Sequence, residues 1–63
     1  PDLFIYEPRG SYHGLAIELK VGYNKPTAEQ LNWLNKLTKR GYLAMSSNGL
    51  DQTIEIIETY LKL

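Results

Sequence analysis

The pattern that most constrains the fold lies at residues 15–21, where apolar and polar side chains alternate. One side of an extended chain through this segment is wholly apolar: Leu15, Ile17, Leu19 and Val21. The other side carries Ala16, Glu18 and Lys20. A period of two over this length predicts a strand with one buried face. The face with Glu18 and Lys20 is then expected at the solvent or in a crevice covered by a helix.

Capping residues delimit a helix after this strand. Thr27, with Gln30 three residues later, forms a capping box. The helix is predicted to run to about Arg40, with Gly41 as its left-handed C-cap. Trp33 lies on the apolar side of this helix, so we expect it in the core rather than as a stacking platform for a base. Cations in the last turn are explained by the helix dipole: Lys36, Lys39 and Arg40.

Three further elements complete the predicted order. Residues 2–6 indicate a short strand with apolar residues on both faces, and residues 42–45 indicate a third strand. After a turn at residues 46–50, centred on Asn48-Gly49, Asp51 is predicted to cap a final helix. The order is β-β-α-β-α, and the strand-helix-strand part predicts a right-handed crossover between parallel strands. The predicted fold class is α/β, a mixed sheet with flanking helices.

Length and cysteine content limit how such a fold is stabilised. The chain has 63 residues and no cysteine. A domain of this size buries only about 60% of its unfolded surface, so a metal, a partner subunit or further sequence is expected to help. Disulfides and thiolate zinc sites are excluded. Residues 1–63 are predicted to be a single domain. Because the first residues already form a strand, elements that precede it are expected to be missing.

The balance of charge restricts contact with nucleic acid. Seven basic residues offset seven acidic ones, so we expect local contact, modest affinity and a shallow dependence on salt. No apolar run approaches the length of a membrane span, and no secretory leader is visible. We therefore expect a protein without a membrane partner, and the lack of cysteine fits a cytoplasmic location.

Asp2, Glu18 and Lys20 are the residues that could carry chemistry. A Glu-x-Lys pair alone is most often an ordinary surface salt bridge. Asp2 starts the preceding strand, and antiparallel pairing could bring its carboxylate toward Glu18 if register and local bend allow. Two converging carboxylates are costly unless they share a cation, and hard oxygen ligands suit Mg²⁺ or Mn²⁺. A lysine beside that cation could orient or deprotonate a water.

The ordered set of a Pro-Asp pair, a spacer, Glu-x-Lys, a helix and a strand resembles the PD-(D/E)xK nuclease superfamily. The stretch that follows the lysine is similar to the VRR-NUC (virus-type replication-repair nuclease) branch, with a glutamine, an aromatic residue and a glycine before the next strand. The residues that carry the resemblance are Pro1, Asp2, Glu18, Lys20, Gln30, Trp33 and Gly41.

The resemblance implies a restriction-endonuclease-like fold and roles for particular residues. Asp2, Glu18 and the main-chain carbonyl of Leu19 would bind Mg²⁺ or Mn²⁺, and Lys20 would support the attacking water. Gln30 would face this site. Its capping role is compatible with that position, so the sequence leaves open whether it also acts there. The family's leading helix and first strand, with an acidic residue on that helix, are not among these residues.

The function that the resemblance implies is metal-dependent endonuclease cleavage of DNA in replication and repair. Branched DNA such as a four-way junction is the expected substrate, in the cytoplasm of a bacterial or phage-infected cell. A homodimer is expected, because the final helix has apolar residues on two neighbouring stripes and two-strand cleavage needs two sites. The alternative is a catalytically inactive module that holds nucleic acid or protein. The presence of Asp2, Glu18 and Lys20 together favours the enzyme.

The remaining polar candidates have ordinary explanations. His13 lies in a loop and is expected to be exposed to solvent rather than to bind a metal. Tyr23, Asn24 and Lys25 directly follow the strand that carries Glu18. An ordinary polar turn is the favoured interpretation, although Lys25 could contact a phosphate.

Overall fold

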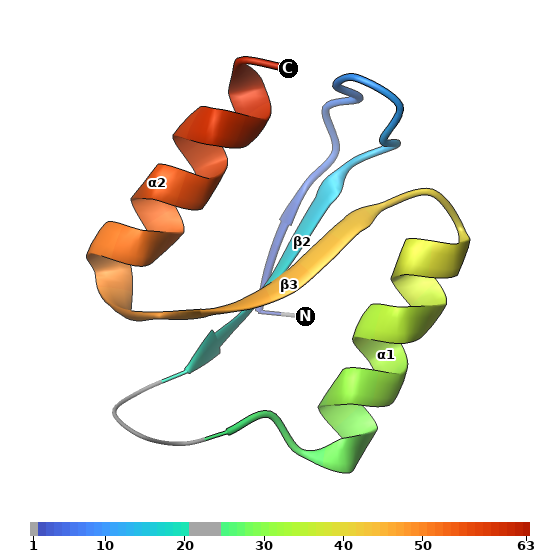
Figure 1. Cartoon of the computed structure of the whole chain (residues 1–63), viewed down its shortest axis with the longest axis vertical. Coiled ribbons are helices and arrows are strands. Elements are labelled where there is room, and N and C mark those ends of the chain that lie inside the picture. The colour runs from blue at the N-terminus through green and yellow to red at the C-terminus, as the bar shows by residue number, and fades with distance from the viewer. Residues whose placement is uncertain (1, 21–24) are drawn as a thin grey trace.

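The computed structural model describes residues 2–20 and 25–63. The elements are β1 (Leu3–Ile5), β2 (Leu15–Lys20), α1 (Ala28–Lys39), β3 (Leu43–Asn48) and α2 (Gly49–Leu61). This order confirms the predicted α/β class and the β-β-α-β-α sequence of elements (Figure 1). The predicted end of the second strand at Val21 lies outside the described residues. Within those residues, no helix is long and apolar enough to cross a membrane.

The central strand of the sheet is β2, in the order β1-β2-β3. Antiparallel pairing places Leu3 of β1 opposite Ile17, and parallel pairing places Ser46 of β3 opposite Glu18. The mixed sheet and the parallel strand pair are therefore as predicted. The start of β2 depends on Gly14, because a Cβ at this position would lie 2.7 Å from the carbonyl oxygen of Ile5.

The helices cover opposite faces of the sheet, so the domain has three layers (Figure 1). Tyr60 of α2 packs in the core with Leu15 and Ile17 of β2, whereas Gln30 of α1 contacts Glu18 on the other face. Leu15, Ala16 and Ile17 are all 0% exposed. Both faces of β2 are therefore covered. Of the two expectations for the face with Glu18 and Lys20, the crevice covered by a helix is the one that the structure confirms.

The passage from β3 into α2 also differs from prediction. β3 continues to Asn48 and α2 begins at Gly49, so the turn predicted at residues 46–50 is not formed. Gly49 takes a φ of +82°, which glycine adopts readily and other residues rarely do, and this lets the chain pass directly from strand to helix. Asp51 lies in the first turn of α2 rather than at its N-cap, which is Asn48 and makes no side-chain capping bond.

A buried pair of hydroxyl groups stabilises the junction between β3 and α2, where the N-cap side chain makes no capping hydrogen bond. The Thr53 hydroxyl donates to the carbonyl of Gly49 at 2.8 Å and lies 2.7 Å from the Ser47 hydroxyl. Because Thr53 donates its proton to the carbonyl, Ser47 is the donor between the two hydroxyls. Both residues are buried. The first turn of α2 is thus bonded to the end of β3.

The outer helix α1 is packed less deeply than its sequence suggests. Leu34 is its buried residue, whereas Trp33 is 53% exposed. The prediction that Trp33 lies in the core was wrong. Successive residues of an α-helix are rotated by about 100° about its axis. Trp33 directly precedes the buried Leu34, so its side chain points to the side of the helix and not toward the sheet.

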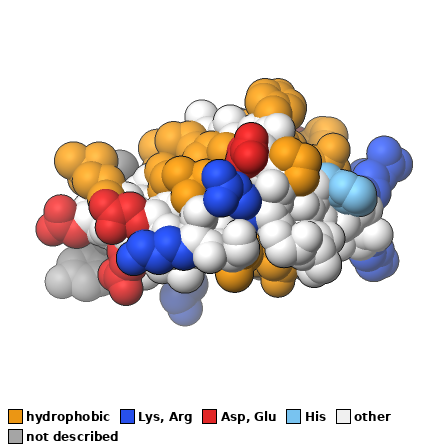
Figure 2. Space-filling model, turned by 90° about the horizontal axis from the view of Figure 1, so that it is seen from above, with side chains coloured by type: hydrophobic (Ala, Val, Ile, Leu, Met, Phe, Trp, Pro, Cys, Tyr) orange, Lys and Arg blue, Asp and Glu red, His pale blue; other side chains and the backbone are white. Residues whose placement is uncertain are grey.

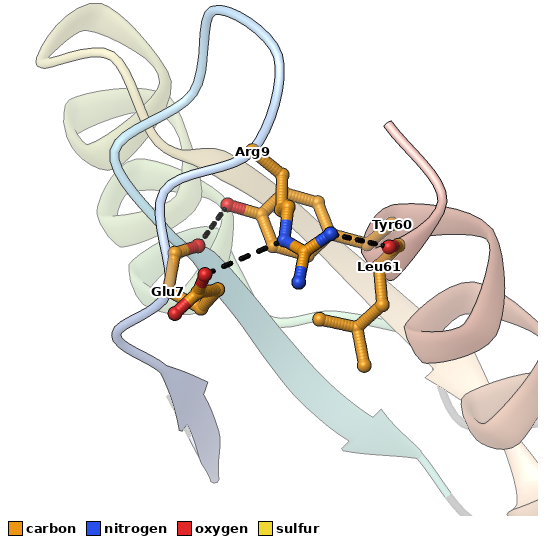
Figure 3. Close-up of polar contacts among 4 residues, drawn as sticks. All are labelled: Glu7, Arg9, Tyr60 and Leu61. Carbon is orange, nitrogen blue, oxygen red and sulfur yellow. Dashed lines mark hydrogen bonds and ion pairs between the residues drawn. The ribbon is translucent and has the colours of Figure 1, made fainter.

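The connection between β1 and β2 is held to the C-terminal end of α2 (Figure 3). The Tyr60 hydroxyl donates to the carbonyl of Glu7 at 2.6 Å, and Arg9 Nη1 donates to the carbonyl of Leu61 at 2.7 Å. Arg9 Nε also lies 3.5 Å from the Glu7 carboxylate. A cation at the last carbonyls of a helix suits its dipole. These contacts fix the loop that leads back to β1, the strand directly after Asp2.

Candidate functional site

The site is built around Glu18, which lies near the end of β2 and is only 6% exposed. Its side chain is on the face of the sheet that α1 covers. Glu18 Oε2 accepts a long hydrogen bond of 3.5 Å from Gln30 Nε2. An ionised carboxylate is costly to bury unless polar groups or a cation compensate for the lost water. The position of Glu18 therefore calls for partners, and α1 supplies one of them.

Asp2 reaches the same stretch of β2 from the neighbouring strand. Its N–H donates to the carbonyl of Ile17 at 3.1 Å, and its Oδ2 accepts the N–H of Leu19 at 2.8 Å. Ile17 and Leu19 are the two residues that flank Glu18 in the chain. The main chain and the carboxylate of Asp2 thus lie against the backbone around Glu18.

Lys20 is held by the same glutamine that contacts Glu18. Its ammonium donates to Gln30 Oε1. The same oxygen accepts the N–H of Thr27 at 3.0 Å, and Thr27 Oγ1 accepts the N–H of Gln30 at 3.1 Å. The predicted capping box is therefore confirmed, and it is joined to the lysine. The first turn of α1 is bonded to the end of β2 through Gln30.

The orientation of the Gln30 amide follows from the charges on either side of it. An amide oxygen accepts hydrogen bonds and an amide nitrogen donates them, so the oxygen belongs beside the ammonium and the nitrogen beside the carboxylate. The contacts have this arrangement, with Lys20 at the oxygen and Glu18 at the nitrogen. The capping bond and the contacts with β2, which the sequence left open for Gln30, are both present.

Ser46 is a polar neighbour that sequence reasoning missed. It lies opposite Glu18 in the parallel register, so its side chain is on the same face of the sheet. Residues 46–48 were assigned to a turn, which removed Ser46 from consideration. No feature of the Ser46-Ser47-Asn48 segment itself predicts a strand, since these residues are polar and precede a glycine. Only the pairing with β2 shows that this segment is extended.

The donor groups fit a hard divalent cation. Carboxylates of Asp2 and Glu18 and a main-chain carbonyl at Leu19 are oxygen ligands of the kind that Mg²⁺ and Mn²⁺ prefer. Over residues 2–20 and 25–63, no three His, Cys, Asp or Glu side chains gather in a group that could hold a metal. A cation here would rely on two carboxylates, a carbonyl and water, and Mg²⁺ commonly keeps several waters.

The loop residue His13 does not belong to this group. The side chain of His13 is exposed, its ring meets that of Tyr42 edge-on at 5.7 Å, and its N–H donates to the carbonyl of Gly41 at 2.8 Å. Lys25 is exposed. Tyr23 and Asn24 lie outside the described residues. The expectation that His13 is a solvent-exposed loop residue is confirmed.

Fold and site together define a class: a small mixed α/β domain with acidic groups and a lysine at the end of its central strand. Among solved structures, the chain is similar to one described as a VRR_NUC domain protein, with a TM-score of 0.95 and 44% sequence identity over 100% of this chain. The chain spans about half of that protein's length, 52%. No family model matches the chain. No curated protein matches it either.

The chain belongs to the VRR-NUC domain family, because all of its residues align with that structure at 44% identity and in the same fold. It is therefore a nuclease-like domain.

Proposed function

We propose that this domain is a metal-dependent endonuclease that hydrolyses phosphodiester bonds in DNA. The observation that carries the proposal is the contact of Gln30 with both Glu18 and Lys20, beside the carboxylate of Asp2. A surface salt bridge would not need a buried carboxylate joined to a lysine through a helix cap, with a second acidic residue bonded to the backbone of Leu19 between them.

Asp2, Glu18 and the carbonyl of Leu19 would hold Mg²⁺ or Mn²⁺. When bound, such a cation supplies charge that polarises the phosphate and makes a nearby water a stronger nucleophile. The Asp2 carboxylate is fixed for this role, because one of its oxygens accepts the N–H of Leu19 at 2.8 Å. The other oxygen is then the one expected to face a ligand.

Lys20 would act on the water and the phosphate. In the hydrolysis, the water oxygen forms a bond to phosphorus as the bond to the departing sugar oxygen breaks. The water gives a proton to the solvent, and the departing sugar oxygen takes one from the solvent, so no net proton is consumed in these two transfers. An ammonium held beside Glu18 can donate to the attacking water or to a phosphate oxygen and so stabilise the developing negative charge. Gln30 would position Lys20 through the hydrogen bond that its amide oxygen accepts.

A homodimer acting on branched DNA in replication and repair is the working form that we propose. Large apolar side chains stay exposed on α2 or directly after it: Leu50 at 73%, Ile54 at 43%, Leu61 at 38% and Leu63 at 54%. Figure 2 shows one face of the domain with hydrophobic side chains exposed between separate charged groups, and without a uniform basic field. A two-fold dimer that buries such surface would present two sites to the two strands of a four-way junction.

Calorimetry with Mn²⁺ and a cleavage assay test the catalytic part. The intact protein should bind Mn²⁺, Glu18→Gln should not, and Glu58→Gln on the exposed side of α2 should bind like the wild type. Lys20→Ala should lose DNA cleavage and keep most of its metal binding, whereas Lys62→Ala should keep both. A protein that binds DNA, does not bind Mn²⁺ and does not cut DNA would be the inactive module instead.

Sedimentation at micromolar concentration tests the dimer. A two-fold dimer that cuts paired strands of a junction is the expected result. A clean monomer that still nicks junctions would contradict the dimer and the paired cut, and would leave the metal site unaffected.

A further inference from the structure

Trp33 is the most conspicuous side chain that the proposed chemistry does not use. It is the sole tryptophan in the sequence, and it is 53% exposed on α1. The Lys36 ammonium lies over its ring, 5.7 Å from the centroid. Large aromatic side chains are usually buried because each removes much apolar surface from water. An indole that is left in solvent with a cation beside it is an arrangement suited to a ligand with a flat apolar face.

Trp33 lies about one helical turn from the residue of α1 that contacts the proposed site. Gln30, whose side chain contacts Lys20 and Glu18, precedes Trp33 by three residues on the same helix. Residues at this spacing are neighbours on the helix surface, with Cβ atoms about 5–6 Å apart. A DNA strand bound at the site therefore has nucleotides within reach of the indole.

The charge of this part of the chain favours a polyanion. Residues 25–40 contain four basic residues and one acidic residue, in a chain whose formal net charge is zero. The basic members are Lys25, Lys36, Lys39 and Arg40. The rest of the chain is correspondingly acidic, so α1 is the element toward which a nucleic-acid strand would be drawn.

We propose that Trp33 stacks on an unpaired base of a single DNA strand that runs from the site along α1, with Lys36 at a backbone phosphate. This inference rests on the proposed function, which places DNA at Glu18 and Lys20. An aromatic ring combined with nearby cations is how proteins hold single strands without sequence preference, because every base has a flat face. The Lys36 ammonium is near the outer limit of about 6 Å for a cation–π contact, so it can turn to a phosphate without losing a strong interaction.

The fluorescence of Trp33 reports on this contact directly, because no other tryptophan contributes. Glu18→Gln protein, without divalent metal, is titrated with a single-stranded thymidine oligonucleotide and with a blunt duplex of equal length. Saturable quenching by the single strand, and much less by the duplex, is expected. Binding of the same oligonucleotide, followed by the anisotropy of a dye on its end, gives the dissociation constant independently.

Variants separate stacking from charge. Trp33→Ala should raise the dissociation constant for the single strand roughly 5- to 150-fold, the range found when one stacked base loses its aromatic partner. Trp33→Phe should lose less, and Lys36→Ala should make the salt dependence shallower by about 0.7 in slope. Tyr6→Ala, at an aromatic side chain that is 82% exposed directly after β1, is the matched control and should bind like the parent.

Binding without quenching, or Trp33→Ala that binds as tightly as the parent, would overturn the stacking proposal. A contact of the ring with a second chain would also overturn the proposal. In that case the emission of Trp33 would change with protein concentration in the absence of DNA, and Trp33→Ala would sediment differently from the parent. Wild-type protein that cuts DNA without quenching contradicts stacking alone. Quenching and tight binding in a wild-type protein that never cuts contradicts the nuclease alone.

Discussion

Gln30 has two structural roles, and replacing it by alanine should affect them by different amounts. Its amide oxygen accepts the N–H of Thr27 at 3.0 Å as part of the helix cap, and it also accepts the ammonium of Lys20. Loss of a capping interaction lowers the free energy of unfolding by about 1 kcal/mol, and the higher helix propensity of alanine restores roughly a few tenths of a kcal/mol. The lost cap alone should therefore lower the unfolding free energy by less than about 1 kcal/mol, which is no more than about 4–8 °C in the melting temperature of so small a domain. The lost 3.5 Å contact with buried Glu18 adds to this fall.

The catalytic loss in Gln30→Ala should be far larger. Lys20 loses its acceptor and Glu18 loses the amide donor at 3.5 Å, so both side chains can move. A misplacement of about 1 Å at a reacting group can cost on the order of 100-fold in rate. Single-turnover cleavage of a labelled four-way junction at saturating protein should slow by about that factor. Mn²⁺ binding should change little, since neither carboxylate is removed.

Thr27→Ala is the matched control for this prediction. It removes the hydroxyl that accepts the Gln30 N–H at 3.1 Å, which also costs about 1 kcal/mol of capping, but it leaves Gln30 beside Lys20. Thr27→Ala should melt at or slightly above the temperature of Gln30→Ala, and the two should cut at very different rates. Equal cleavage rates in Gln30→Ala and Thr27→Ala would refute the reasoning, because Gln30 would then act only as a helix cap.

Three stability predictions follow from single contacts. Tyr60→Phe removes the 2.6 Å bond to the loop after β1 and should lower the unfolding free energy, measured in urea, by about 0.5–1.5 kcal/mol. Thr53→Val leaves the buried Ser47 hydroxyl without its acceptor and should cost about 1–3 kcal/mol by the same measurement. Gly14→Ala places a Cβ 2.7 Å from a carbonyl oxygen of β1, and should cost about 1–3 kcal/mol and slow cleavage by displacing the strand next to Asp2. A Gly14→Ala protein with wild-type melting temperature would contradict the close approach.

The parts of the fold that could be predicted from sequence are those that local chemistry determines. The alternation in β2, the capping box at Thr27 and Gln30, and the left-handed glycine at Gly41 each depend on a few neighbouring residues. The pairing of Asp2 with the backbone beside Glu18 could be anticipated only as a possibility, because it depends on register. A one-residue shift would have turned the carboxylate to the other face.

Predictions failed where long-range packing decides the outcome. Ser46 and Ser47 have no intrinsic preference for a strand, yet the ladder to β2 and the Thr53 hydroxyl hold them extended. Asn48-Gly49 was predicted to be the centre of a turn, but at Gly49, with its positive φ, the chain passes directly from β3 into α2. Trp33 has the large apolar side chain that is typical of a core residue, but its exposure depends on where α1 packs on the sheet.

The burial of Glu18 leads to a final prediction about stability and metal. A carboxylate that is 6% exposed is retained at a cost, and a cation that binds only the folded protein would offset that cost. Such a cation stabilises by mass action, by about 2.7 kcal/mol at 100 times its dissociation constant, which is about 10–20 °C in melting temperature for a domain of this length. Mn²⁺ should therefore raise the melting temperature of the wild type, and excess chelator should reverse the effect.

Glu18→Gln should abolish this metal-dependent rise and still fold without metal, because glutamine keeps the shape of the side chain and can hydrogen-bond at the same place. Glu58→Gln, an exposed acidic residue on α2, should keep the full rise. A rise in Glu18→Gln equal to that of the wild type would mean that the cation binds elsewhere. The buried carboxylate would then be a structural partner of Gln30 and not a metal ligand.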